Sequence, residues 1–425
     1  MELISRETIK PLIPTPPHLR TYTLSFFDHI STTNYVPIIF FYTTNIDDPI
    51  SEISNLLKKS LSQILTQYYP LAGRIKDRFT IDCNDEGILF LVATIKCKLS
   101  EILENPKEEI LDSLFPDKLQ WEAHSWSSTL LAIQINFFDS GGMAISVCMS
   151  HKIADAVTMT NFVKDWSNIC LIPESNSFRQ PVLNSAIVFP QGNLPVIKPE
   201  AEMRKIKTVT RRYVFDSSKI DALKAMVSSH LQIIPTRVQV VLALLHRCAA
   251  SAMRSNHPTT LMQLVNLRPR MEPPLPTNSM GNMSWHCCIS TADHQPELHD
   301  LVSKLKESLE KFTETYVKKF KGEEWFTSIM ECLKEIYLMG QTKNLVLYNC
   351  SSWCRFGHYE VDFGWGKPIW VTSSISGLKN MFHLIDARDG QGIEAIVSLE
   401  EKEMTVFEND EELLAYACSR NTQIA

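Results

Sequence analysis

A histidine and an aspartate stand four residues apart in the string Ser-His-Lys-Ile-Ala-Asp-Ala at residues 150–156. A histidine side chain has an ordinary pKa of about 6.5, so His151 could take a proton from a hydroxyl group and return it later in a reaction. Asp155 could cap a helix, or pair with an arginine, and so fix the backbone that aims His151. An isolated pair of this kind also fits a plain loop and helix start, because polar residues are common there.

A second cluster of interest lies at residues 351–368. It reads Ser-Ser-Trp-Cys-Arg at 351–355 and Asp-Phe-Gly-Trp-Gly-Lys-Pro at 362–368. The chain has only 14 glycines, yet two of them flank Trp365, which favours a backbone that needs glycine. An Asp-Phe-Gly triplet also occurs in protein kinases, but the His-Arg-Asp loop and the glycine-rich loop of kinases are missing. The alternative to a functional motif is a tight bend with Trp365 in the core.

The sequence offers no marked covalent nucleophile and no marked metal site. There is no Gly-x-Ser-x-Gly elbow, and neither Cys350 nor Cys354 has a sequence context that marks a nucleophile. The eleven cysteines form no Cys-x-x-Cys pair, which disfavours zinc and fits reduced thiols in the cytoplasm. We therefore expect no metal.

Composition sets the class of protein. A length of 425 residues predicts two to three domains at about 150 residues each. With 44% hydrophobic and 21% charged residues the chain should fold into globular domains, and a net charge of −6 without basic runs makes a nucleic-acid partner unlikely. The apolar stretches are far shorter than a membrane span, and the first residues lack the basic and apolar regions of a secretion signal. We expect a cytoplasmic protein without a membrane partner.

The elements of the first half place His151 at a junction. Apolar residues at helical spacing predict a helix over 53–65 and another over 159–170. Strict alternation over 131–137 and 143–149, around a turn at 139–142, predicts a hairpin of two half-buried strands. His151 would thus lie where a strand ends and a helix begins, a usual place for functional side chains.

The second half follows a proline-interrupted segment that we interpret as a crossover linker. The predicted domains are 1–175 and 204–425, with the linker at 176–203. Beyond the linker we expect strands over 212–215, 263–267, 360–363, 369–373 and 393–399, and helices over 220–227, 238–248 and 301–338. The mixture of elements indicates an α/β protein.

The two motifs together resemble those of the plant BAHD acyltransferases, which move acyl groups from coenzyme A to alcohols or amines. The family's His-x-x-x-Asp and Asp-Phe-Gly-Trp-Gly motifs are matched without departure by residues 151–155 and 362–366. Segments 69–74, 266–270 and 281–282 also resemble the family, so the resemblance covers nearly the whole length. An intact pair of motifs disfavours a non-catalytic homologue that only binds a small ligand.

The resemblance implies a fold and a mechanism. It implies two chloramphenicol-acetyltransferase-like domains of similar size, each a mixed β-sheet with flanking helices, joined by a long crossover loop with a channel between them. His151 would act in the channel as general base in a ternary complex, with direct transfer from acyl-CoA to the acceptor. Asp155 would point away from substrate and pair with an arginine, for which Arg270 is the candidate.

The resemblance also assigns roles to further residues. The motif residues Asp362, Phe363, Gly364, Trp365 and Gly366 would be structural and support the coenzyme side. Ser351 matches the family's hydroxyl residue before Ser-Trp and is the candidate donor to the oxyanion. Coenzyme contacts are expected from Arg237, Asn266, Arg355 and Lys367. No prosthetic group is implied, and the family likeness indicates a monomer.

Within the family the chain is most similar to the subgroup of vinorine synthase and salutaridinol acetyltransferase, in segments 150–155, 265–274 and 352–368. This implies acetyl-CoA and a hydroxyl of an alkaloid or a similar bulky plant metabolite. A malonyl donor is the main alternative, and Arg420 could then hold its carboxylate if the last helix folds back. A hydrolase that uses water as acceptor is a further alternative.

Overall fold

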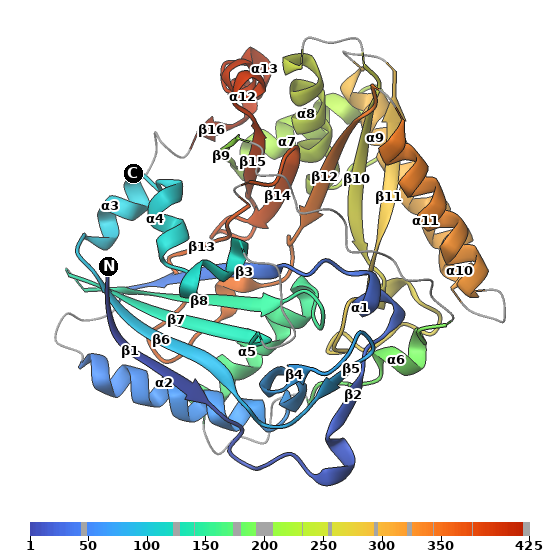
Figure 1. Cartoon of the computed structure of the whole chain (residues 1–425). Helices are drawn as coiled ribbons and strands as arrows, with labels where there is room; N and C mark the ends of the chain where they lie inside the picture. The colour runs from blue at the N-terminus through green and yellow to red at the C-terminus, as the bar shows by residue number, and fades with distance from the viewer. Residues whose placement is uncertain are drawn as a thin grey trace. The chain divides into compact units, whose positions relative to one another are not determined.

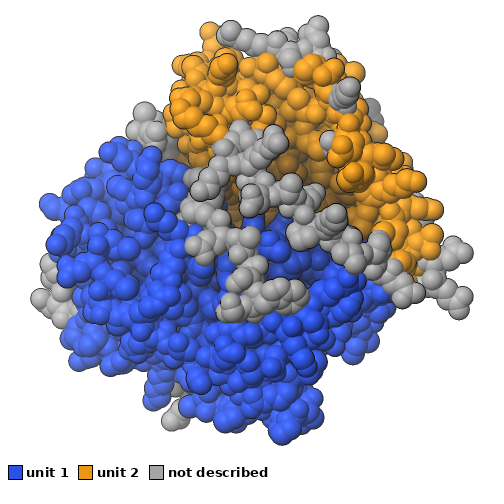
Figure 2. Space-filling model, in the orientation of Figure 1, with its two compact units in different colours: residues 1–200, 276–283, 356–374 blue, residues 201–275, 284–355, 375–425 orange. Residues whose placement is uncertain are grey.

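The chain forms two compact units in a computed structural model, and each unit is made of several chain segments. The first unit comprises Met1–Glu200, Pro276–Met283 and Phe356–Ser374, and the second comprises Ala201–Leu275, Ser284–Arg355 and Ile375–Ala425 (Figure 2). The structure describes residues 1–419 except 44–48, 122–127, 140, 173–179, 193–206, 232, 254–256, 293–295, 321–324, 343 and 376. The predicted Arg420 contact lies outside the described residues.

The first unit is built on a six-stranded mixed sheet with the strand order β1-β6-β7-β8-β3-β13 (Figure 1). A small sheet, β2-β5-β4, accompanies it. The strands are β1 Glu2–Ile9, β2 Thr21–Thr23, β3 Tyr35–Tyr42, β4 Arg74–Ile75, β5 Thr80–Asp82, β6 Ile88–Ile95, β7 Leu131–Phe138, β8 Met143–Ser150 and β13 Trp370–Thr372. The helices are α1 Phe26–Ile30, α2 Ile50–Leu65, α3 Leu99–Glu104, α4 Glu108–Ser113, α5 Ala156–Leu171 and α6 Ser185–Val188.

Both faces of this sheet are covered. On one face Phe41, Ala144 and Trp370 pack with apolar residues of α3 and α4. On the other face α2 and α5 pack together, and the indole nitrogen of Trp166 on α5 donates to Ser60 Oγ on α2 at 3.0 Å. The predicted hairpin of β7 and β8 is therefore correct in position, but every residue of both strands is buried rather than half of them.

The second unit has a seven-stranded mixed sheet with the order β11-β10-β12-β14-β15-β9-β16. Its strands are β9 Thr208–Phe215, β10 Thr259–Asn266, β11 Ser284–Thr291, β12 Val346–Ser352, β14 Met381–Asp386, β15 Ile393–Glu400 and β16 Cys418–Ser419. Its helices are α7 Ser217–Ser228, α8 Arg237–Ala252, α9 Leu298–Lys311, α10 Val317–Lys319, α11 Trp325–Gln341, α12 Glu401–Phe407 and α13 Glu411–Tyr416.

Helices α7, α8, α9, α12 and α13 bury one face of the second sheet. Alternate residues of the central strands, among them Tyr348, Cys350 and Phe382, join the apolar residues of these helices in one core. Because side chains alternate along a strand, the residues between them, such as Ser351 and His383, point to the opposite face. No helix in the described part of the chain is long and apolar enough to cross a membrane.

The structure differs from the predicted elements in three places. The C-terminal domain predicted over 204–425 is not contiguous, because β13 pairs with β3 and so places Phe356–Ser374 in the first unit. The strand predicted over 360–363 is wrong, since a 3₁₀ turn at His358–Glu360 leads there into a loop. The helix predicted over 301–338 is also interrupted, by a π-helical turn at Phe312–Tyr316.

Candidate active site

His151 directly follows β8, at the junction that the sequence predicted. Its backbone N–H donates to Asn34 O at 2.9 Å, which fixes the loop, while its side chain is partly exposed. The ring nitrogen Nδ1 lies 2.8 Å from Oδ1 of Asn282. The imidazole is thus held at one nitrogen, and it remains partly open to solvent.

Asp155 acts as a cap and as a clamp at the same time. Its Oδ1 accepts the backbone N–H of Thr158 at 2.9 Å and so caps α5, while Oδ2 accepts the backbone N–H of Met283 at 3.0 Å. The side chain is buried, with Asp155 only 6% exposed. The cap reading of Asp155 is confirmed by this geometry, and the second bond ties α5 to the segment that carries Asn282.

Replacing Asp155 with alanine should remove both of these bonds. We expect Asp155→Ala to lower the free energy of unfolding by about 2 to 4 kcal/mol, from the lost helix cap and the buried Met283 N–H left without its acceptor. Asp155→Asn keeps one acceptor oxygen and should lose less. Urea unfolding of the three proteins measures the difference, and an Asp155→Ala variant as stable as the wild type would contradict the clamp.

Residues 281–283 are the part of the site for which the sequence predicts no role. Thr158 Oγ1 donates to Gly281 O at 3.0 Å, and Asn282 reaches both His151 and Asp28, the latter on α1. In the sequence, Gly281-Asn282 stands out only as a family-like dipeptide, and Asp28 carries no predicted role. The pattern Ser-x-x-Asp at residues 25–28, a capping box, was the signal available for Asp28.

The Asp-Phe-Gly-Trp-Gly motif forms a turn that its own aspartate organises. Asp362 Oδ1 accepts the backbone N–H of Gly364 at 2.7 Å and of Gly366 at 3.0 Å. Both glycines have positive φ, 112° and 87°, in which other residues are strained. The glycines that flank Trp365 thus serve the backbone conformation, as their rarity in the chain indicated.

Phe363 anchors this turn in the first unit. Its ring is buried and contacts Trp166 at 4.7 Å and Tyr42 at 6.1 Å between ring centroids, in edge-to-face geometry. Trp365, predicted as a core residue in the alternative reading, is partly exposed and stacks on Phe363 at 6.2 Å. The motif therefore joins β3 and α5 through one buried aromatic residue.

Ser351 lies on β12, in the second unit. Its Oγ accepts the indole N–H of Trp353 at 3.1 Å, and its neighbour across the parallel pair of strands is His383. The ring of His383 packs edge-on to Trp353, with 4.1 Å between centroids. Because the indole N–H of Trp353 donates the hydrogen bond and Ser351 Oγ accepts it, the O–H of the serine remains free to donate to another group.

Arg237, predicted to contact the coenzyme, uses its guanidinium inside the second unit. Nη1 donates to Gly390 O at 2.8 Å and to Gln391 O at 2.5 Å, while Nη2 pairs with Asp386 at 3.0 Å. These contacts brace the turn between β14 and β15. A coenzyme phosphate would compete with them, so the proposed role of Arg237 stays a prediction.

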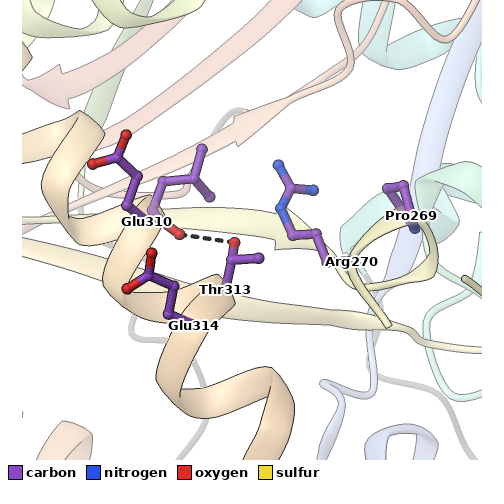
Figure 3. Close-up of a pocket in the computed structure, with 6 residues that line it drawn as sticks. Pro269, Arg270, Glu310, Thr313 and Glu314 are labelled. Carbon is purple, nitrogen blue, oxygen red and sulfur yellow. Dashed lines mark hydrogen bonds between the residues drawn. The ribbon is translucent and has the colours of Figure 1, made fainter. Parts of the chain in front are cut away.

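Asn266 and Arg270 are joined at the end of β10. Asn266 O accepts from Nη1 of Arg270 at 2.8 Å, and Asn266 Oδ1 accepts the backbone N–H of Arg268 at 3.1 Å. Arg270 also lines a pocket of about 500 Å³ with Pro269, Leu309, Glu310, Thr313 and Glu314 (Figure 3). The predicted pairing of Asp155 with Arg270 would join residues of different units, and it stays a prediction.

Arg355 and Lys367 are both exposed, and their expected contacts with the coenzyme stay predictions. Arg355 has a positive φ of 67°, and its backbone N–H donates to Asp386 at 2.6 Å. The structure thus brings His151, Asp155 and the Asp362–Gly366 turn, with Lys367, into the first unit. It places Ser351, Arg237, Asn266, Arg270 and Arg355 in the second.

Comparison with known proteins finds relatives that match nearly the whole chain. A family model described as "Transferase family" matches residues 1–414. The 17,18-epoxy-17-hydroxycur-19-ene N-malonyltransferase of Strychnos nux-vomica is 38% identical over 432 residues, which cover 98% of this chain and 90% of the relative. The stemmadenine O-acetyltransferase of Catharanthus roseus is 37% identical over 424 residues, covering 96% of both chains. The crystal structure of vinorine synthase matches with a TM-score of 0.84 and 32% identity over 98% of each chain.

Proposed function

The chain belongs to the BAHD family of plant acyltransferases, and from that premise we propose that it acetylates a hydroxyl of an alkaloid or a similarly bulky plant metabolite. The donor is acetyl-CoA, and His151 is the general base. One observation carries the proposal: within the His-x-x-x-Asp motif, His151 is partly exposed while Asp155 is buried in a clamp. Of the two titratable groups only the imidazole is partly exposed, which supports His151 as the group that meets the substrate.

The reaction is direct transfer between two bound substrates. His151 takes the proton from the acceptor hydroxyl, and the oxygen attacks the thioester carbonyl to form a tetrahedral intermediate. The carbon–sulfur bond then breaks, and the imidazolium returns its proton to the thiolate of coenzyme A. A positioned general base contributes about 10²- to 10⁴-fold, so holding both substrates in place must supply much of the rest.

The cysteines near Ser351 support direct transfer over a covalent acyl-enzyme. Burial raises the pKa of Cys354 to about 12, and it also raises the pKa of Cys350. A thiol with a raised pKa carries little thiolate near neutral pH, and the thiolate is the reactive form. Neither side chain is therefore suited to take the acyl group.

Malonyl-CoA is the second candidate donor, because the Strychnos relative is named as an N-malonyltransferase. That name also keeps an amine acceptor as an alternative to the hydroxyl. We further infer a monomeric, cytoplasmic enzyme, for which the eleven free cysteines support the reducing compartment. Light scattering on the purified protein tests the monomer.

The experiment that tests the proposal is a product screen. Purified protein is incubated with acetyl-CoA or malonyl-CoA and a panel of alkaloid, terpenoid and phenolic alcohols, and products are detected by mass. We expect an acetyl ester of at least one alkaloid alcohol, lost in His151→Ala. A malonyl ester would reverse the donor assignment, free acid would indicate a hydrolase, and binding of coenzyme A without any product would contradict the proposed reaction.

A further inference from the structure

We propose that Asn282 and Asp28 are positioning residues that hold His151 as a base at Nε2. Asn282 lies between the two, with Oδ1 2.8 Å from His151 Nδ1 and Nδ2 2.8 Å from Asp28 Oδ1. All three residues belong to the first unit, although they are far apart in the sequence. The inference deepens the proposed function and rests on it.

The orientation of the Asn282 amide is determined by its surroundings. Nδ2 lies 2.7 Å from the backbone carbonyl oxygen of His151 as well as 2.8 Å from Asp28. A carbonyl oxygen only accepts hydrogen bonds, so the amide NH₂ group must face it whatever the protonation of Asp28. Oδ1 of Asn282 is therefore the atom that meets the imidazole.

This orientation selects one tautomer of His151. Oδ1 can only accept, so Nδ1 of the imidazole must carry the proton. In the neutral ring the lone pair then lies on Nε2, which is the nitrogen left to take a proton from the acceptor hydroxyl. When the imidazolium forms, the Nδ1–H bond to Asn282 becomes charge-assisted and stabilises it further.

Asp28 is the buried anchor of this arrangement. It is fully buried, and its Oδ2 accepts from Ser25 N at 2.9 Å and from Ser25 Oγ at 2.7 Å, while Oδ1 also accepts from Asn282 N at 2.7 Å. Burial raises the pKa of Asp28, and the hydrogen bonds from Ser25 and Asn282 oppose that shift. Each oxygen has two donors, so the carboxyl group cannot rotate without losing them.

Lys152, the residue after His151, binds the end of helix α1, which carries Asp28. Lys152 Nζ donates to His29 O at 2.9 Å and to Ser31 O at 2.5 Å, both at the end of α1. Asp28 also lies on α1, so the His151 loop contacts this helix directly through Lys152 and indirectly through the Asn282 amide. Movement of the imidazole relative to the Asn282 amide is restricted accordingly.

The approach of Asn282 also explains a glycine and the role of the motif aspartate. Gly281 has a φ of 126°, and an added Cβ would lie 2.9 Å from Ser185 Cβ, so another side chain would displace the segment. Asp155 holds the next residue, Met283, through its backbone N–H. Asp155 thus acts on His151 through the segment that carries Asn282.

The test compares Asn282→Ala with a matched control. Asn278→Ala removes an amide that donates to Gln180 O at 2.6 Å from the same segment, without touching His151. We expect Asn282→Ala to lower kcat by about 10- to 100-fold, the range for a lost hydrogen bond to a group that becomes charged. Both KM values should stay within about threefold, and Asn278→Ala should change kcat by less than about twofold.

Two readouts separate positioning from a merely structural role. In a His151→Ala background, Asn282→Ala should cause no further loss, because residues that act as a unit are not additive. An equal loss in both backgrounds would overturn the proposal. The second readout is the ¹⁵N NMR spectrum of histidine-labelled wild-type protein, where the signal missing in His151→Ala identifies His151.

We expect neutral His151 to be the Nδ1–H tautomer in the wild type. The opposite tautomer would overturn the proposal, and this measurement needs no Asn282 variant to fold. It also needs no substrate, so it remains informative if the proposed reaction fails. A wild type that forms no acylated product but shows the Nδ1–H tautomer would refute the proposed function and leave the positioning of His151 supported.

Discussion

Replacing His151 with alanine is expected to reduce acyl transfer by about 10²- to 10⁴-fold while the protein stays folded. The variant lacks the proposed general base, but the backbone bond from residue 151 to Asn34 O does not involve the side chain and remains. The side chain is partly exposed, and its one described side-chain hydrogen bond goes to Asn282. In the variant, water in the space left by the ring can donate to Asn282 Oδ1, so stability should change little.

The measurement is kcat with saturating acyl-CoA and acceptor, together with the thermal unfolding temperature. His230→Ala serves as the control, since His230 is an exposed histidine at the end of α7 that bonds Met226 O and Ser229 Oγ. We expect the control to keep turnover within about twofold. Full turnover in His151→Ala would remove the general base from the mechanism.

The location of His151 could be predicted from the sequence because it depends on local pattern. Alternation of apolar residues ends at Ser150, and helical spacing begins after Asp155, so the junction follows from the two periods. The cap, one of the two roles that the sequence allows for Asp155, is confirmed, and it was predictable because capping involves residues within one turn. Neither inference needed information from distant parts of the chain.

Burial on both faces of the first sheet could not be read from the same pattern. Gln134 and Asn136 occupy the alternate positions of β7, where polar residues normally indicate solvent. They are buried because Gln134 Nε2 donates to Asn136 Oδ1 at 2.7 Å and Asn136 Nδ2 donates to Leu114 O at 2.9 Å. When buried polar side chains bond one another in this way, the alternation of polar and apolar residues no longer tells a solvent-exposed face of a sheet from a covered one.

The partners of His151 could not be predicted either, for a different reason. Asn282 is 131 residues from His151 in the sequence. It lies in a short segment of the first unit that is inserted between two segments of the second unit. Contacts between residues so far apart depend on the tertiary fold, and no periodic pattern of residues in the sequence marks them. The charge of Arg237 suggests a coenzyme contact, but its ion pair with Asp386 could not be predicted, because the two residues are 149 positions apart in the sequence.

Ser351→Ala is expected to lower kcat by about 10²- to 10³-fold, the loss found when one oxyanion donor is removed. The structural reason lies in the direction of its hydrogen bonds. Trp353 Nε1–H donates to Ser351 Oγ at 3.1 Å, so the serine proton is not needed for that bond and can be donated to a developing oxyanion. Among the described residues no acceptor takes it in the absence of substrate.

The control must separate this donor from the support that Ser351 gives to Trp353. Ser351→Ala leaves the indole N–H without its acceptor, which should cost about 1 to 3 kcal/mol of stability if the group stays buried. Ser351→Thr keeps the hydroxyl and should retain most of the turnover, and Ser352→Ala tests the adjacent serine on β12. A loss of stability with full turnover in Ser351→Ala would make Ser351 a brace for Trp353 alone. If Ser351→Ala loses kcat and Ser351→Thr keeps it, the reaction requires the hydroxyl group at residue 351. Threonine retains an O–H that can donate to the tetrahedral intermediate, whereas alanine has no such donor.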